Sequence, residues 1–184
     1  MLFRSLQIQV PDHPSLESLV PLVPVLLSYV LSFLYIGISW ITHHHLLHTC
    51  ERVTGRILWA NLHVLFWLSL LPFATGWMGE NHFSTMPSMV YGIVLLLVSC
   101  AFWLLQQAIM TSEGESSLLR KAIGSDRKGN LTLAALVLGI FITYWSAHLA
   151  QAVYVAIALT WIAPDKRIEK AIREREAQRP DAVG

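Results

Sequence analysis

Residues 19–41 read LVPLVPVLLSYVLSFLYIGISWI and contain no Asp, Glu, Lys or Arg. A helix of ~20 apolar residues spans the ~30 Å hydrocarbon core of a bilayer, so this stretch alone is long enough to cross a membrane. Three further charge-free intervals run from Arg56 to Glu80, from Glu80 to Glu113 and from Lys128 to Asp165. Only 14% of the chain is charged, against about a quarter of a typical soluble domain. The sequence therefore predicts an all-α integral membrane protein.

The last interval, residues 129–164, is too long for one crossing, because a single helix over it would run ~54 Å at 1.5 Å per residue. Two crossings place all of the 13 Lys and Arg residues except Arg4 on one side of the membrane. The positive-inside rule assigns that side to the cytoplasm. We therefore predict five transmembrane helices. They cover about residues 19–42, 57–79, 88–110, 129–145 and 147–164.

This topology also places the two ends of the chain. Residues 1–18 are predicted to form an extracellular segment, and residues 165–184, which mix charges at near-helical spacing, a charged cytoplasmic tail. The N-terminus has no recognisable signal peptide, so an extracellular start suggests a further helix upstream. The expected location is the plasma membrane, with several crossings and a cytoplasmic C-terminus.

Four histidines gather at the inner end of the first predicted helix: His43, His44, His45 and His48. His44 and His48 stand four positions apart and share a helix face, a spacing that can bind a metal ion. A metal site needs three or four converging ligands, and no Asp, Glu or Cys lies at matching spacing. We therefore expect these histidines to form hydrogen bonds at the membrane interface. No metal site and no cofactor is predicted.

Polar side chains also interrupt the predicted spans, at Asn61, His63, His148 and Gln151. Such groups are costly when they face lipid, so we expect them to face protein or a water-filled path. The spans contain no carboxylate or Lys, which argues against a proton pump or an ion-coupled transporter. No Ser near a His has a partnered acid, so the chain is not predicted to be an enzyme. Nothing indicates a nucleic-acid partner.

Four short motifs resemble one family of membrane proteins. They are IGISWITHHHLLH at residues 36–48, LWANL at 58–62, SLLPF at 69–73 and WIAPD at 161–165. Together they make the chain similar, from about Leu19 to Glu169, to the bacterial relatives of the endolysosomal potassium channel, the transmembrane-protein-175 family. The Trp-x-x-His-His element and the Asn and Leu-Pro-Phe pattern are fairly specific in combination.

The resemblance implies a six-helix protomer that assembles as a homotetramer around a central potassium-permeable pore. The five visible helices would be equivalent to helices 2–6, because the Arg-x-x-x-Phe-Ser-Asp signature of the first, pore-lining helix is absent from this chain. Residues 1–18 would be the remnant of that helix and the loop after it, and the pore-lining residues are unknown. By resemblance, Trp40, His43, His44 and Asn61 belong to a polar shell that supports the filter.

Three functions follow from these observations. The first is a potassium channel subunit, or an N-terminally truncated copy of one, that mediates passive K⁺ flux as a homotetramer. Its partners would be the lipid bilayer, potassium ions and further copies of itself. The alternative is a non-conducting membrane scaffold or interaction protein, and the third is a histidine-rich metal-binding membrane protein.

Overall fold

The computed structural model describes residues 16–50, 52–114, 117–123 and 126–162. These residues form one 3-10 helix and six α-helices, and no strand occurs among them. The elements are η2 (Leu16–Leu22), α1 (Val23–His48), α2 (Gly55–Glu80), α3 (Thr85–Glu113), α4 (Leu118–Ile123), α5 (Arg127–Ile142) and α6 (Ala147–Ile162). The all-helical class predicted from the sequence is confirmed.

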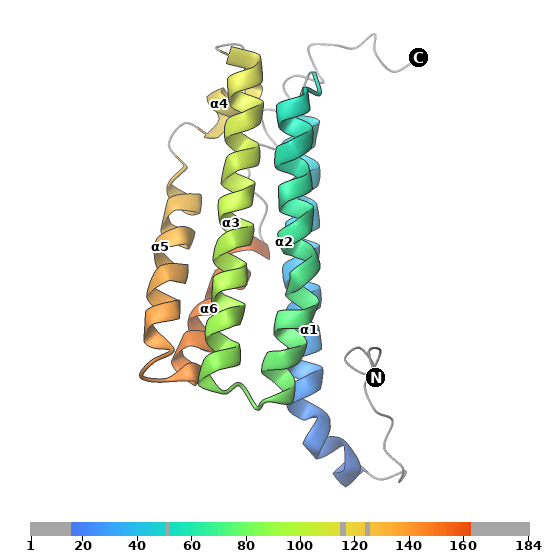
Figure 1. Cartoon of the computed structure of the whole chain (residues 1–184), viewed down its shortest axis with the longest axis vertical. Coiled ribbons are helices and arrows are strands. Elements are labelled where there is room, and N and C mark those ends of the chain that lie inside the picture. Colours follow the sequence, from blue (N-terminus) through green and yellow to red (C-terminus); the bar gives the residue numbers. More distant parts are fainter. Residues whose placement is uncertain (1–15, 51, 115–116, 124–125, 163–184) are drawn as a thin grey trace.

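Three long helices, α1, α2 and α3, run along the long axis of the molecule, and the shorter α5 and α6 pack beside them (Figure 1). α3 packs against α2, α5 and α6, while α6 also contacts α1. The α5–α6 turn lies at the same end of the bundle as the α2–α3 connection, and α4 lies at the opposite end (Figure 1). The chain thus runs up and down the bundle, with α3 at its centre.

The first long helix differs from its predicted range of 19–42. Its start is a 3-10 helix up to Leu22 that includes Pro21, and the α-helix then continues to His48. The predicted helix ended at residue 42. The helix persists there because Leu46 is fully buried and packs in a cluster with side chains of α2, α3 and α4. Thr49 caps its C-terminal end, and the Thr49 hydroxyl donates to the Leu46 carbonyl.

The region predicted as two helices over 129–145 and 147–164 does contain two helices. Asp126 begins α5 by accepting a hydrogen bond from the Gly129 amide at 2.9 Å, so this helix starts two residues earlier than expected. It ends at Ile142, and α6 begins at Ala147. The second and third predicted ranges, 57–79 and 88–110, are in contrast shorter than α2 and α3. The predicted tail 165–184 and residues 1–15 lie outside the described residues.

Two buried clusters hold the helices together. One centres on Tyr91 and Tyr154 and joins α1, α2, α3, α5 and α6; the other, around Leu46, Leu105 and Leu119, joins α1 to α4. Gly92 and Gly139 lie against the Tyr154 side chain, where a Cβ atom at Gly139 would stand 2.7 Å from Cε1 of that ring. Small residues at these two positions therefore allow α3, α5 and α6 to approach closely.

Three helical segments are long and apolar enough to cross a membrane: Leu19–His48, Gly55–Glu80 and Thr85–Glu113. α6 is a shorter apolar helix, and α5 has the same length of 16 residues. In the most apolar part of α3, 44% of the residues are buried, against 17% for the first segment and 22% for α2. Large apolar side chains such as Phe33 and Phe73 are exposed on the outside of the bundle. This exterior suits a lipid environment.

Candidate functional site

Two of the polar side chains that the sequence singled out meet where α1 faces α2. His43 of α1 donates a hydrogen bond from Nε2 to Oδ1 of Asn61 on α2, at 2.5 Å. Both residues are half-buried. Since the amide oxygen can only accept, the His43 ring carries its proton on Nε2 in this contact. The hydrogen bond links two apolar helices, and each of the two polar groups has its partner within the protein.

Trp40 extends this contact along α1. Its ring lies over that of His43, with centroids 6.4 Å apart and planes inclined by 26°. The two residues are three positions apart, so they lie on one face of the helix. Trp40 is 69% exposed, so its outer face is available to another protein segment or to lipid. We refer to Trp40, His43 and Asn61 as the Trp–His–Asn cluster.

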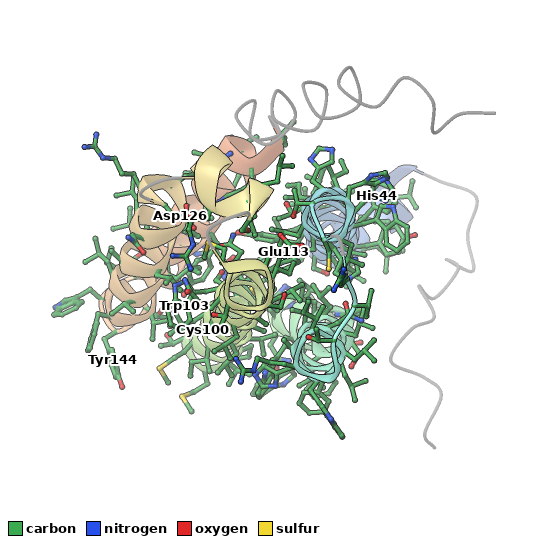
Figure 2. All side chains as sticks on the ribbon, turned by 90° about the horizontal axis from the view of Figure 1, so that it is seen from above. His44, Cys100, Trp103, Glu113, Asp126 and Tyr144 are labelled. Carbon is green, nitrogen blue, oxygen red and sulfur yellow. The ribbon has the colours of Figure 1, made fainter. Side chains whose placement is uncertain are left out.

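His44 does not join this cluster. Its ring lies 4.8 Å from that of His48 and 6.3 Å from that of His45, between centroids. Viewed along the bundle, His44 lies at the outer edge on the α1 side (Figure 2). The structure therefore brings together three of the four residues that the sequence grouped. Among the described residues, no three His, Cys, Asp or Glu side chains converge as a metal site would require.

The other polar groups of the predicted spans have different surroundings. Gln151 of α6 reaches across the core and donates to the Ser88 hydroxyl at 3.0 Å and to the Met78 sulfur at 2.8 Å. His63 accepts a hydrogen bond from Nε1 of Trp67, one turn along its own helix, at 3.2 Å. His148 is exposed near the start of α6. Of the four polar residues Asn61, His63, His148 and Gln151, two therefore bond to side chains on another described helix, Asn61 and Gln151.

Three tyrosines in the core, Tyr35, Tyr91 and Tyr154, form a group that no motif of the sequence marks. The Tyr35 hydroxyl donates to the Tyr154 carbonyl at 2.5 Å. The Tyr91 ring stands edge-on to both, at 6.1 Å from Tyr35 and 5.6 Å from Tyr154. Their only signal in the sequence is that each is an isolated Tyr in an aliphatic run. The group ties α1, α3 and α6 together.

Comparisons with known proteins agree with the resemblance of the motifs. The family model described as "Endosomal/lysosomal potassium channel TMEM175" matches residues 2–72, a range that contains the whole Trp–His–Asn cluster. A potassium channel of Chryseobacterium sp. (strain P1-3) is 46% identical over 169 residues, which are 92% of this chain and 88% of that protein.

A second relative is more distant. A potassium channel of Streptomyces collinus (strain DSM 40733 / Tue 365) is 33% identical over 83 residues, which are 43% of this chain and 40% of that protein. No solved structure matches the chain.

Proposed function

Because this chain belongs to the TMEM175 potassium channel family, we propose that it is a subunit of a potassium channel. It conducts K⁺ passively, down its electrochemical gradient, as a homotetramer in the plasma membrane. The observation that carries the proposal is the 46% identity to a potassium channel over 92% of the chain. Ion channels are not an enzyme class, and the function proposed here needs no catalytic residue.

The proposed topology has five crossings by the residues of this chain and a cytoplasmic C-terminus. α5 and α6 form an antiparallel pair whose turn lies level with the α2–α3 connection (Figure 1). Each has 16 residues, which gives about 24 Å at 1.5 Å per residue. That length is a little short of the ~30 Å core, and a bilayer adapts to such a difference at modest cost.

The Trp–His–Asn cluster supports the pore from outside it. Polar side chains that faced lipid would be costly, whereas this cluster is both polar and partly exposed. We propose that its outer face is covered by the pore-lining helix or by a neighbouring subunit. His44 lies at the same end of α1 but outside this cluster. No residue of this chain is assigned to the pore wall itself.

Ion flux into liposomes tests the proposal. The purified protein is reconstituted into vesicles loaded with K⁺, and K⁺ efflux into K⁺-free buffer is followed with a pH-sensitive dye and a proton ionophore. We expect efflux well above that of empty vesicles, approaching the signal set by valinomycin. Absence of efflux from vesicles that contain verified tetramers would contradict the channel and favour a scaffold.

A further inference from the structure

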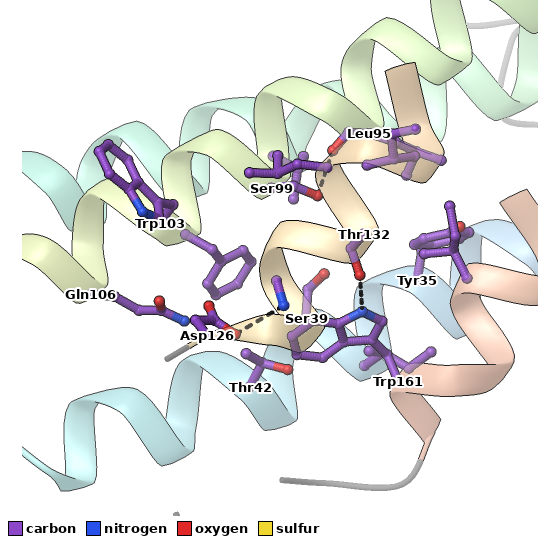
Figure 3. A pocket seen from close by; sticks show the side chains of 17 residues that line it. Tyr35, Ser39, Thr42, Leu95, Ser99, Trp103, Gln106, Asp126, Thr132 and Trp161 are labelled. Atoms are coloured by element: carbon purple, nitrogen blue, oxygen red, sulfur yellow. Dashed lines mark hydrogen bonds between the residues drawn. The ribbon is translucent and has the colours of Figure 1, made fainter. Parts of the chain in front are cut away.

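A cavity of about 90 Å³ lies inside the bundle, between α1, α3, α5 and α6 (Figure 3). It is separate from the Trp–His–Asn cluster, none of whose members lines it. Its lining is polar at one end and apolar at the other. α1 and α3 run toward the end where α5 begins, so Thr42, Gln106 and Asp126 lie at one end of the cavity and Tyr35, Leu95 and Leu136 at the other.

The end near Asp126 is polar and has unused hydrogen-bonding capacity. Ser39 and Gln106 are only 7% and 9% exposed, yet neither side chain forms a hydrogen bond with any described residue, and the same holds for Thr42. Buried polar groups of native proteins nearly always have a partner. The hydroxyls of Ser39 and Thr42 and the amide of Gln106 line the cavity and have no hydrogen-bond partner among the described residues. They therefore mark a place for a polar group of a ligand.

Asp126 supplies the only charge among the described lining residues. Its Oδ1 caps α5 by accepting from the Gly129 amide at 2.9 Å, and a carboxylate retains further acceptor capacity after one such bond. Lys128 lies near the same end, but its ammonium is placed over the Trp161 ring, 4.3 Å from the centroid, and does not line the cavity. The polar end thus favours a cation that donates hydrogen bonds.

The other end offers apolar contact and no spare polar group. Leu95, Val98, Leu136 and Ile157 line it, and the hydroxyl of Tyr35 is already committed to the Tyr154 carbonyl. A bare metal ion or hydrated K⁺ would gain nothing from these side chains. Binding there would remove the apolar surface of a hydrocarbon chain from water, which favours binding by roughly 25 cal/mol per Å² of buried surface. The cavity of about 90 Å³ is smaller than the ~150 Å³ cavity that is known to bind benzene, so the ligand has only a few carbons.

We propose that this cavity binds a small primary alkylammonium ion. Its ammonium donates to the Asp126 carboxylate and to the side-chain oxygens of Thr42 and Gln106, and its alkyl chain lies against Leu136 and Val98. Anions are disfavoured by Asp126, and a neutral alcohol would forgo the charge-assisted hydrogen bond. The site is independent of ion conduction, so its test stands apart from the flux assay.

Butylammonium is the probe, with butanol and butyrate as matched neutral and anionic controls. Binding to the protein in nanodiscs is followed by saturation-transfer NMR, with empty nanodiscs subtracted. Asp126→Asn is the central variant, because Asn keeps an oxygen that caps α5 while it removes the charge. We expect saturable millimolar binding of butylammonium to the wild type and about tenfold weaker binding to Asp126→Asn, the loss of one charge-assisted hydrogen bond.

A second variant tests the apolar end. Val98→Phe fills the cavity and should weaken the binding of butylammonium and butanol alike, whereas Asp126→Asn should leave butanol unchanged. Val98→Leu, a smaller change at the same position, serves if Val98→Phe does not fold, and should weaken both probes to a lesser degree. The proposal is overturned if butylammonium does not saturate the wild type, if Asp126→Asn binds it equally well, or if butyrate binds as tightly.

Discussion

The hydrogen bond from His43 to Asn61 joins polar side chains of two helices that otherwise present mainly apolar surface. The i, i+3 spacing of Trp40 and His43 predicts their proximity from the sequence alone. Asn61 lies on another helix, and only the family resemblance placed it with them. The sequence does not show which of His43 and His44 faces α2, because adjacent histidines differ only in the direction in which the helix presents them.

Replacing Asn61 tests the value of this contact. Asn61→Leu removes the acceptor and leaves the His43 Nε2–H without its partner, so it should destabilise the protein by about 1 kcal/mol, as for interhelical hydrogen bonds in membranes. It should also lower K⁺ flux. His44→Ala is the matched control and should change stability by less than about 0.5 kcal/mol. Unfolding by SDS titration measures both, and equal effects would contradict the assignment.

A different residue-scale feature is the packing of Tyr154 between two glycines. An added Cβ at Gly92 would overlap the Tyr154 hydroxyl, and one at Gly139 would press on the ring. Each Gly→Ala change should therefore destabilise the protein by about 1–3 kcal/mol, the usual cost of overpacking. Sequence analysis could not identify these positions, because the reason for each glycine is a side chain on another helix.

Gly37 provides the control for those variants. A Cβ there would meet no atom within 4 Å, so Gly37→Ala should be neutral or stabilise α1 by up to about 1 kcal/mol through helix propensity. The three variants are compared in the same SDS titration. If Gly92→Ala and Gly139→Ala behaved like Gly37→Ala, the close approach of α3, α5 and α6 would be wrong.

At the scale of elements, charge-free intervals were a reliable guide to where helices occur and a poorer guide to where they end. The hydropathy of the sequence falls after residue 42, but α1 continues because Leu46 is buried against side chains of α2, α3 and α4. The break between α5 and α6 contains no Gly or Pro. It was predicted by the distribution of Lys and Arg, a property of the whole chain, and no local signal marks it.

The topology of this helix pair can be measured by cysteine labelling. In a background with Cys50→Ser and Cys100→Ser, Tyr144→Cys places one thiol in the α5–α6 turn, where Tyr144 is exposed. We expect a membrane-impermeant maleimide to modify it on intact cells. Arg120→Cys, on the opposite end of the bundle, should react only after the cells are permeabilised. The reverse pattern, or protection of Tyr144→Cys in both conditions, would contradict two crossings.

For the whole molecule, α3 forms the buried centre, while α1 is exposed along much of its length. The all-helical bundle and its membrane character follow from composition and charge distribution. The cavity between α1, α3, α5 and α6 does not, because Ser39, Gln106 and Asp126 are far apart in the sequence and meet only through packing.

The most direct test of the channel is its reversal potential in a planar bilayer. Tetramers of the purified protein separate a KCl solution from an equimolar NaCl solution. The account predicts a steady current whose reversal potential is displaced from zero in the direction expected for K⁺ leaving the KCl side. No current, or reversal at zero, would contradict a potassium channel.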